Sequence, residues 1–388
     1  MKRVTCIFCF IMSAIVFTAC GSDGDGNDAL SWQKMAPELR VTSDAGNSGD
    51  PSLSWSGSEF GVSWEDNRYG NNEILFARLS SSGVKISGDV RMSNDAAGSY
   101  NASLSWTGSE FGTSWEDSRH GNDEIYFAGV QYDSTISVLD TRVISFTSAS
   151  LIPSLVWTGS EYGISWYDLR DSNAEIYFAR LSNGGSKIGS DLRLTFDAAG
   201  SYNSSLSWTG SEFGVSWEDN RDGDYEIYFA RVSASGNTVI SETRITEDAA
   251  GSYDSSLAWT GSEYGVSWED RRDGNAEIYF ARISASGDTV GPDVRVTSDG
   301  ANSYYPSLSW TGGGFGISWR DDRDGNAEIY FAWINPSGAK YGPDLRVTSD
   351  AGISNYSSLC WSGSVFGVAW EDDRDGNTEI YFARIGLR

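Results

Sequence analysis

The chain has 388 residues, of which 54 are Asp or Glu and 28 are Lys or Arg, so its formal net charge at pH 7 is -26. This surplus of negative charge disfavours binding to nucleic acid or to an anionic lipid surface, because both are themselves negatively charged. Trp occurs 16 times and aromatic residues make up 13% of the chain, which excludes a disordered protein, since disordered chains are poor in aromatic residues.

The first 19 residues are predicted to be a secretory signal peptide, because Lys2 and Arg3 precede an apolar stretch that is too short to span a membrane comfortably. The sequence "FTAC", which ends at Cys20, resembles the lipobox of bacterial lipoproteins, in which the Cys carries the lipid. The following residues are rich in Gly and Asp and predict a flexible tether over residues 20–31. The resemblance implies a protein of the bacterial cell envelope that is attached to the membrane only by its lipid, and Gly21 favours the outer membrane. An ordinary secretory signal with an incidental Cys is the alternative.

Residues 32–388 consist of seven units of 51 residues, without an insertion between them. In the fifth unit, "SLAW", "YGVSW", "EIYFARI" and "DVRVT" have the size alternation or the β-branched and aromatic content of strands, and Gly-containing turns separate them. Four short strands in a repeat of roughly 40–50 residues are typical of a propeller blade. The sequence therefore predicts an all-β fold, a seven-bladed β-propeller of four-stranded antiparallel blades.

The two ends of the chain predict how the ring closes. The last unit stops after its third strand, at Arg388, and the missing fourth strand is found at the other end of the chain as "PELRVTSD", residues 37–44. Arg40 in this segment has the position of the strand-four Arg in the other units. We therefore expect the N-terminal strand to complete the seventh blade and to remove the exposed sheet edges that would otherwise invite aggregation.

Each unit also has two Trp residues at fixed positions, in its first and second predicted strands. A Trp side chain is wide enough to fill the wedge between radially arranged blades, and Trp can also stack on sugars. Because these residues lie in strands and recur in all seven units, we expect them to pack in the core rather than to bind a ligand.

The repeat resembles a known family. "PSLSWTGGGFGISW" at residues 306–319, followed by "DRDGNAEIYFA" at residues 322–332, is similar to the WD40-like repeat of TolB-type propellers. The resemblance covers all seven units and implies a propeller of the bacterial envelope. The units are also similar to repeats that occur in large sets of surface lipoproteins. A role beside peptidoglycan-associated lipoproteins would be an analogy with TolB itself.

Chain direction predicts that two polar loops share one face of the propeller, which we call the upper face. One is the loop between strands two and three, "WEDxRDGN", and the other is the loop into the next blade, "TSDAAGSYN". In the first of these loops an Asp stands two residues before an Arg. We expect the Asp to accept backbone N–H bonds and the Arg to bridge to a nearby carboxylate or carbonyl, which would hold the loop in one shape; a ligand role is the alternative. The pairs are Asp66/Arg68, Asp117/Arg119, Asp168/Arg170, Asp219/Arg221, Asp270/Arg272, Asp321/Arg323 and Asp372/Arg374.

The other acidic residues of these loops are expected to be exposed and to give the upper face a negative rim. Examples are Glu65, Glu218, Asp222, Asp273, Asp324 and Asp375. Calcium is a candidate ligand at "DRDGNAE", although the spacing is not that of an EF-hand and the Arg within the motif disfavours a cation. We expect no cofactor and no other metal site, because His120 is the only His and the cysteines supply no metal-binding motif.

The loop into the innermost strand carries Tyr together with Asn or Asp, which either bind glycans near the axis or pack over the neighbouring blade. These candidate ligand residues are Tyr100, Tyr202, Tyr253, Tyr304, Tyr356, Asn101 and Asn203. Blade three departs from the repeat, with Phe146, Leu151 and Ile152 where other blades have polar residues or Tyr. These three residues predict an apolar patch for a protein partner, or a repeat that has drifted and packs on itself.

A catalytic triad would depend on His120 alone, in an otherwise ordinary repeat, so we expect a protein that is not an enzyme. The sequence favours an envelope-anchored binding or scaffold module that docks a protein partner through the face of the propeller. The alternative is a lectin-like surface lipoprotein, in which near-identical loops form several weak carbohydrate sites. A spacer without a specific ligand is a third interpretation, and a glycoside-processing enzyme is less favoured.

Overall fold

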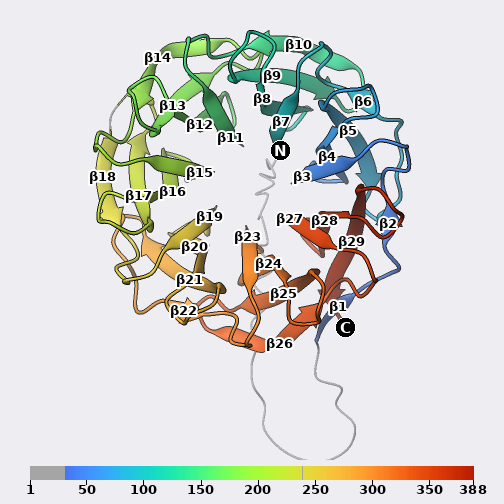
Figure 1. Ribbon diagram of the computed structural model, residues 1–388, viewed down its shortest axis with the longest axis vertical. Coiled ribbons are helices and arrows are strands. Elements are labelled where there is room, and N and C mark those ends of the chain that lie inside the picture. Colours follow the sequence, from blue (N-terminus) through green and yellow to red (C-terminus); the bar gives the residue numbers. More distant parts are fainter. Residues whose placement is uncertain (1–30, 238) are drawn as a thin grey trace, which may run out of the picture.

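The computed structural model describes residues 31–237 and 239–388, which form a closed ring of seven β-sheets around a central axis (Figure 1). The seven sheets are antiparallel, so the predicted all-β, seven-bladed propeller is confirmed. The predicted signal peptide, Cys20 and the predicted tether apart from Ser31 lie outside the described residues. No helix in the described ranges is both long and apolar enough to cross a membrane.

The strands of each blade follow one another from the axis to the outer edge (Figure 1). The innermost strands are β3 (Ser48–Trp55), β7 (Ser99–Trp106), β11 (Ser150–Trp157), β15 (Ser201–Trp208), β19 (Ser252–Trp259), β23 (Ser303–Trp310) and β27 (Ser354–Trp361). The second strands are β4 (Glu59–Asp66), β8 (Glu110–Asp117), β12 (Tyr162–Asp168), β16 (Glu212–Asp219), β20 (Glu263–Asp270), β24 (Phe315–Asp321) and β28 (Phe366–Asp372).

The third strands pair with the second ones without a register shift, whereas the outermost strands vary in length from two to seven residues. The third strands are β5 (Glu73–Ser80), β9 (Glu124–Gln131), β13 (Glu175–Leu181), β17 (Glu226–Ser233), β21 (Glu277–Ser284), β25 (Glu328–Ile334) and β29 (Glu379–Leu387). The outermost strands are β6 (Val90–Arg91), β10 (Ile136–Arg142), β14 (Lys187–Arg193), β18 (Val239–Arg244), β22 (Val294–Arg295) and β26 (Lys340–Arg346), with β1 (Trp32–Lys34) and β2 (Leu39–Arg40) in the seventh blade.

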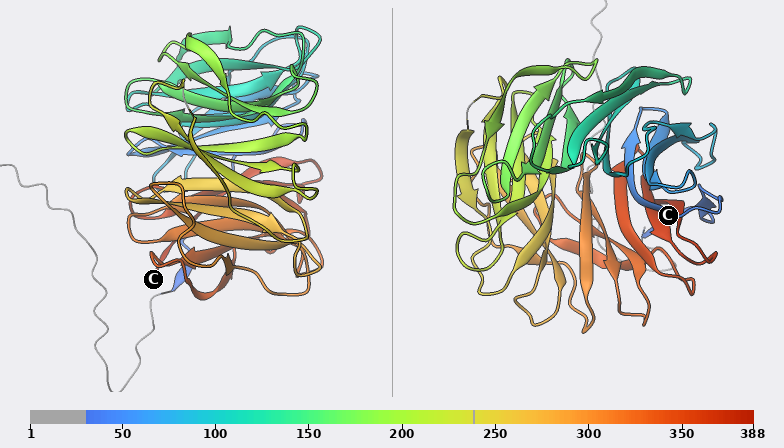
Figure 2. Two further views of the ribbon diagram at one scale, coloured as in Figure 1. Left: turned by 90° about the vertical axis from the view of Figure 1, so that its left-hand side faces the viewer. Right: turned by 45° about the horizontal axis from the view of Figure 1, so that its top comes forward.

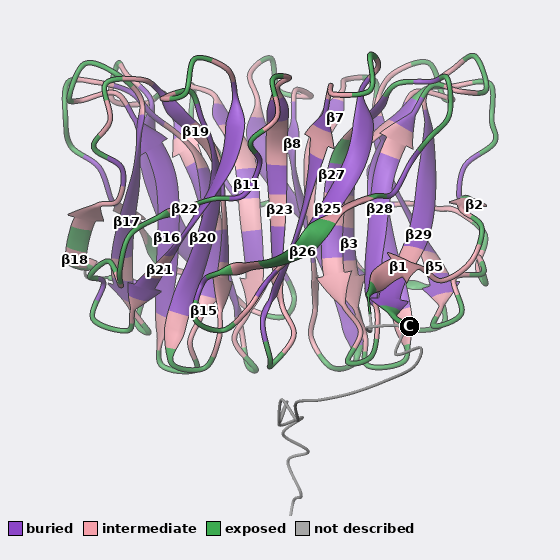
Figure 3. Ribbon diagram, turned by 90° about the horizontal axis from the view of Figure 1, so that it is seen from below, coloured by how far each residue is buried: buried purple, intermediate pink, exposed green. Residues whose placement is uncertain are grey.

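The blades stand side by side around the axis (Figure 2), and most of their inner strand residues are buried (Figure 3). The hydrophobic core lies between adjacent blades, as in the cluster that combines Phe178 of blade three with Phe213 of blade four. The Trp of every second strand is fully buried, as predicted, whereas the Trp of each innermost strand is only partly buried and packs against the core. Gly163 shows why large and small residues alternate in the second strand, because a Cβ at this position would collide with Phe213 of the next blade. The repeated aromatic and Gly positions therefore form one interlocking contact between neighbouring blades. The buried Trp residues are Trp64, Trp115, Trp166, Trp217, Trp268, Trp319 and Trp370.

The N-terminal segment closes the ring, as the chain ends predicted. In β2, Leu39 and Arg40 pair with Phe382 and Tyr381 of β29, in the place of a fourth strand. The additional strand β1 pairs with the far half of β29, and the ring of Trp32 lies 4.8 Å from that of Trp333 in the sixth blade. The closure therefore uses two short strands, where the sequence predicted one.

The two polar loops share the upper face, because Asn173 between strands two and three donates to the backbone oxygens of Asp197 and Ala199 in the loop to the next blade, at 2.9 and 2.6 Å. One boundary differs from the prediction. The Tyr and Asn at the end of "TSDAAGSYN" belong to the innermost strand, as Tyr202 and Asn203 do in β15. A bulge between Tyr202 and Ser205 lets the strand continue up to the loop.

Candidate functional site at the propeller axis

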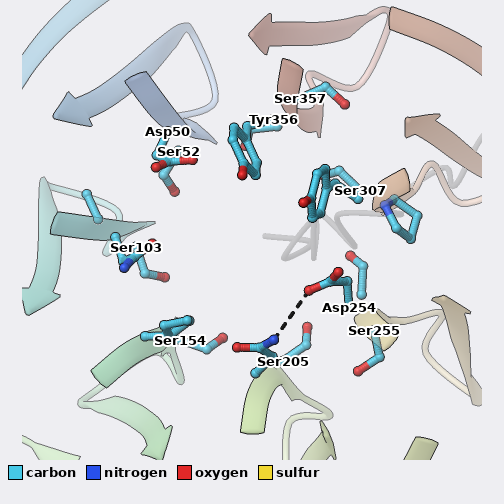
Figure 4. A pocket seen from close by; sticks show the side chains of 18 of the residues that line it. Asp50, Ser52, Ser103, Ser154, Ser205, Asp254, Ser255, Ser307, Tyr356 and Ser357 are labelled. Carbon is cyan, nitrogen blue, oxygen red and sulfur yellow. Dashed lines mark hydrogen bonds between the residues drawn. The ribbon is translucent and has the colours of Figure 1, made fainter. Parts of the chain in front are cut away.

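A pocket of about 520 Å³ lies on the propeller axis and is lined by three consecutive residues from each innermost strand (Figure 4). These strands run from the upper to the lower face, so the first residue of each triplet lies nearest the upper face. We call these first residues the mouth residues and the third ones the serine ring. The mouth residues are Asp50, Asn101, Ile152, Asn203, Asp254, Tyr305 and Tyr356.

All seven mouth residues have a backbone conformation that is unusual for residues other than Gly. Their φ angles lie between 44° and 54°, and each stands at the bulge of its innermost strand. The left-handed region is uncommon for non-Gly residues and is an outlier for a β-branched residue such as Ile152. Such strained residues cluster at ligand-binding sites, where the surrounding structure holds them in place.

Buried Glu residues hold several of the mouth residues by their backbone N–H groups. Glu65 accepts from Asn101 at 2.8 Å, and Glu218 accepts from Asp254 at 3.0 Å. The expectation that Glu65 and Glu218 form an exposed rim is therefore wrong, since their side chains point toward the bulge of the next blade and the residues are only 8% and 7% exposed. Glu116 and Glu371 accept in the same way from Ile152 and Asp50.

This ring of carboxyl groups is costly to ionise. Burial, together with the charge of Asp254, raises the pKa of Glu218 from its ordinary value of 4.5 to about 7. Burial likewise raises the pKa of Glu371 to about 7 and that of Asp254 to about 6. Above these values the mouth is negatively charged and disfavours an anionic ligand.

The serine ring joins neighbouring blades below the mouth. The hydroxyl oxygen of each ring Ser accepts a backbone N–H from a Leu of the next blade, at 3.0 to 3.1 Å. Within residues 31–237 and 239–388 no group accepts the hydroxyl protons of these Ser residues, so they are left as donors toward the axis. The ring consists of Ser52, Ser103, Ser154, Ser205, Ser256, Ser307 and Ser358.

The structure brings only some of the predicted ligand residues to the pocket. Asn101, Asn203 and Tyr356 line it, and so does Ile152, which was predicted as part of an apolar patch. The lining does not include the other predicted Tyr residues, which lie one position earlier in the innermost strands. These are Tyr100, Tyr202, Tyr253 and Tyr304.

Those four Tyr residues contact other parts of the upper face. Tyr202 lies with its ring 5.3 Å from that of Tyr167, and a Cβ on Gly98, Gly200 or Gly251 would collide with the Tyr two residues later. Sequence reasoning missed Asp50 and Tyr305 as ligand candidates. The spacing of 51 residues would have found them, because it places both in register with Asn101.

Two mouth residues form an aromatic pair. The rings of Tyr305 and Tyr356, from blades six and seven, lie 4.6 Å apart with an interplanar angle of 35°. In blades four and five, Asn203 donates to Asp254 at 3.4 Å, the bond drawn in Figure 4. The pocket therefore has an aromatic side and a polar side.

The seven Asp–Arg pairs lie in the loops between strands two and three, where each Arg donates to its Asp. In blade four, Asp219 accepts from the backbone N–H and the guanidinium of Arg221, from the Trp217 indole at 3.1 Å and from the Ser201 hydroxyl at 2.8 Å. Arg221 also pairs with Asp197 at 2.9 Å. Because these groups form hydrogen bonds and ion pairs with one another, the geometry favours a role in holding the loop over a role in binding a ligand.

The three residues of the predicted partner patch lie in different surroundings. Phe146 is 41% exposed and its ring packs 3.5 Å from the Arg170 guanidinium, in the place where other blades have an Asp. Leu151 is half-buried and pairs with Tyr167 on β12, whereas Ile152 lines the axial pocket.

The acidic residues proposed for calcium have partners within the protein. In blade five, Asp273 accepts from the Tyr279 hydroxyl at 2.5 Å and pairs with Arg295 at 3.3 Å. The described ranges contain no group of three or more His, Cys, Asp or Glu residues arranged to hold a metal ion. His120 lies outside the pocket lining, with its ring 6.3 Å from that of Tyr126.

No protein family model and no curated protein matches the chain. Among solved structures, the chain is similar to an oligogalacturonate lyase in complex with manganese, with a TM-score of 0.57, 10% identity and coverage of 92% of this chain and 96% of that chain. It is also similar to a prolyl endopeptidase, with a TM-score of 0.53, 14% identity and coverage of 84% of this chain and 45% of that chain. A third similar structure is the acylaminoacyl peptidase of Pyrococcus horikoshii, with a TM-score of 0.53, 10% identity and coverage of 87% of this chain and 51% of that chain. The chain thus spans about half the length of these two peptidases. At such identities the similarity shows the β-propeller fold alone, and the resemblance to TolB-type repeats stays a prediction.

Proposed function

We propose that the protein is a non-catalytic binding module that takes one ligand at the upper mouth of the axial pocket. The observation that carries this proposal is where the repeats differ. The Asp–Arg pairs and the serine ring are the same in all seven units, whereas the mouth residues comprise two Asp, two Asn, one Ile and two Tyr. Seven equal carbohydrate sites would keep the same residues in every blade, so this variation supports a single asymmetric site over the multivalent lectin.

The chemistry of the pocket also favours binding over catalysis. The Glu carboxyl groups with raised pKa values, such as that of Glu218, accept backbone N–H bonds that hold the mouth residues, and they lie behind the lining. Asp254, whose pKa is also raised, lies on the lining itself. This arrangement supports a positioning role for the Glu carboxyl groups.

The membrane attachment belongs to the same proposal. The backbones of Ser31 and Arg388 exchange hydrogen bonds of 2.9 and 3.1 Å, so the described chain begins beside the lower end of β29 (Figure 3). A lipid on Cys20 would precede this point. The lower face would then lie toward the envelope membrane, and the upper mouth would face away from it and be open to a partner.

A second candidate is the docking of an envelope protein at the upper face of blade three. Phe146 and Leu169 are 41% and 40% exposed there, where most blades have polar residues. The two candidates use different residues, so variants can separate them.

The test is a cross-linking pull-down from intact envelopes with a tag after Arg388, which lies away from the mouth. Three forms are compared: the wild type, a mouth variant (Tyr305→Asn with Tyr356→Asn) and a blade-three variant (Phe146→Ser with Leu169→Ser). Asn already occupies the mouth position in blades two and four, so the mouth variant should fold. A protein or glycan that the wild type and the blade-three variant capture, but the mouth variant does not, supports the proposal. Loss in the blade-three variant alone favours the second candidate, and equal recovery by all three contradicts both.

A further inference from the structure

The mouth residues differ from blade to blade, but their order around the ring follows a pattern. Read in ring order, they run Asp, Asn, Ile, Asn, Asp, Tyr, Tyr, which is a mirror sequence centred on Ile152. Repeats that had drifted at random would rarely produce such an order. It divides the mouth into four sides.

One side is aliphatic and one is aromatic, and these two sides face each other. In a ring of seven blades, blade three lies across the axis from the gap between blades six and seven (Figures 1 and 4). Ile152 therefore stands opposite the pair formed by Tyr305 and Tyr356. A ligand group between them needs two apolar faces, because a polar group directed at Ile152 or at an aromatic ring would lose its hydrogen bonds with water.

The two remaining sides are polar and alike. Asp50 with Asn101 forms one, and Asp254 with Asn203 forms the other. Carboxylate and amide groups accept and donate hydrogen bonds, so these sides suit hydroxyl groups along both edges of a flat ligand. The Asp charges disfavour a phosphate or a carboxylate at the same place.

The serine ring, which we call the floor of the pocket, adds a third requirement for the ligand. The hydroxyl protons of the serine ring are donors without an acceptor among the described residues, and the floor carries no charged side chain. A ligand that reaches it must offer oxygen acceptors, and the Asp charges at the mouth favour neutral ones. The pocket volume of about 520 Å³ falls within the range of roughly 300–1,000 Å³ that is usual for small-molecule sites, so it can admit the end of a chain but not a folded domain.

We infer that the axial pocket binds the terminal sugars of a neutral glycan whose pyranose rings carry equatorial hydroxyl groups. Such a ring presents C–H groups on both faces and hydroxyl groups around its edge, which matches the aliphatic and aromatic walls, the two polar sides and the floor. An axial hydroxyl directed at Ile152 would lack a partner, because that side chain has no polar atom. This inference rests on the proposed function and names the ligand of that same site.

The test is a titration of the mature protein with cellotetraose, whose hydroxyl groups are all equatorial, and with β-1,4-mannotetraose, which has an axial hydroxyl on each ring. Binding is followed by calorimetry and by saturation-transfer NMR. We expect cellotetraose to bind with a dissociation constant about tenfold lower than mannotetraose, because an unpaired axial hydroxyl loses its hydrogen bonds with water on binding. Equal binding of the two sugars would overturn the equatorial preference.

Variants locate the site. Tyr305→Asn with Tyr356→Asn, and separately Ile152→Asn, should each weaken cellotetraose binding about tenfold or more, because each removes one of the two facing walls. Tyr341→Asn, on the outer strand β26 where the side chain is 66% exposed, is the matched control and should bind as the wild type does. Ile152→Asn keeps the test decisive if the double variant fails to fold. Binding that survives loss of either wall would place the sugar elsewhere.

The failure of this inference can be told apart from failure of the proposed function. If neither oligosaccharide binds, but the pull-down still captures a protein only when the mouth residues are intact, the assignment of a glycan ligand is wrong and the proposed binding site remains supported. If nothing depends on the mouth residues in either experiment, both proposals are overturned.

Discussion

Asp219 shows at the scale of a single residue how the loops are held. Its carboxylate is fully buried and accepts from Arg221, Trp217 and Ser201. Replacing it by Ala would leave these buried donors unpaired, so we expect Asp219→Ala to lower the free energy of unfolding by about 3–5 kcal/mol. Urea denaturation measures this change, with the exposed Asp224→Ala as the control, which should shift the midpoint little. A similar small shift for both would show that the pair does not stabilise the loop.

Ala102 offers the opposite case, a residue whose replacement should stabilise the protein. In blade four, Ser204 in the same position donates to Ser165 at 2.8 Å. The equivalent Ser63 in blade one is fully buried, and within the described part of the chain its hydroxyl has no hydrogen-bond partner. We expect Ala102→Ser to supply that partner and to add about 1 kcal/mol to the free energy of unfolding, measured as a rise in the thermal midpoint. A fall in the midpoint would mean that the two side chains do not meet.

Among the elements, β1 and β2 should contribute differently to ring closure. Removal of residues 31–36 takes away β1 and the packing of Trp32, but leaves β2 paired with β29. Removal of residues 31–44 also takes away β2 and exposes the edge of β29, which is a template for aggregation. We therefore expect the shorter deletion to lower the thermal midpoint and to remain monodisperse in gel filtration, and the longer one to aggregate. A monodisperse longer deletion with the midpoint of the wild type would show that closure does not depend on this segment.

For the whole molecule, two sets of carboxyl groups with opposite pKa shifts predict a maximum of stability near pH 4–5. Burial opposes ionisation of Asp219, but its hydrogen bonds lower its pKa below the ordinary 3.8, so its contribution is present above that value and is lost as the pH falls through the lower folded pKa. Glu218 and Glu371 have folded pKa values raised from 4.5 to about 7, so the unfolded chain releases their protons first. Their stability contribution is present below pH 4.5 and is lost as the pH rises to about 7.

Thermal midpoints between pH 3 and 8 measure this profile. The variant Glu218→Gln with Glu371→Gln keeps the acceptors for the mouth residues but cannot ionise, so it should flatten the decline between pH 5 and 7. The general repulsion from the net charge of -26 stays almost the same in this variant. A wild-type midpoint that rises steadily from pH 5 to 8 would contradict the assignment.

The sequence alone predicted those features of the fold and of the loops that recur in every unit. The spacing of 51 residues, the four strands of each unit and the missing strand at the C-terminus were enough to predict the number of blades and the closure by residues 37–44. The Asp–Arg pairs were visible as well, because both partners stand two residues apart in every loop. Periodic patterns and short-range pairs are encoded locally, so they can be read without coordinates.

Only the tertiary structure decided which side chains reach the axis. A bulge at φ near +50° turns Asn101 and Tyr305 into the pocket and leaves Tyr100 and Tyr304 outside its lining. A shift of one residue in a strand exchanges its two faces, and sequence periodicity does not locate such a bulge. The burial of Glu65 was equally hidden, because its partner is the backbone N–H of Asn101 in the next blade. The repeats thus determined the ring, whereas contacts between blades determined the site at its centre.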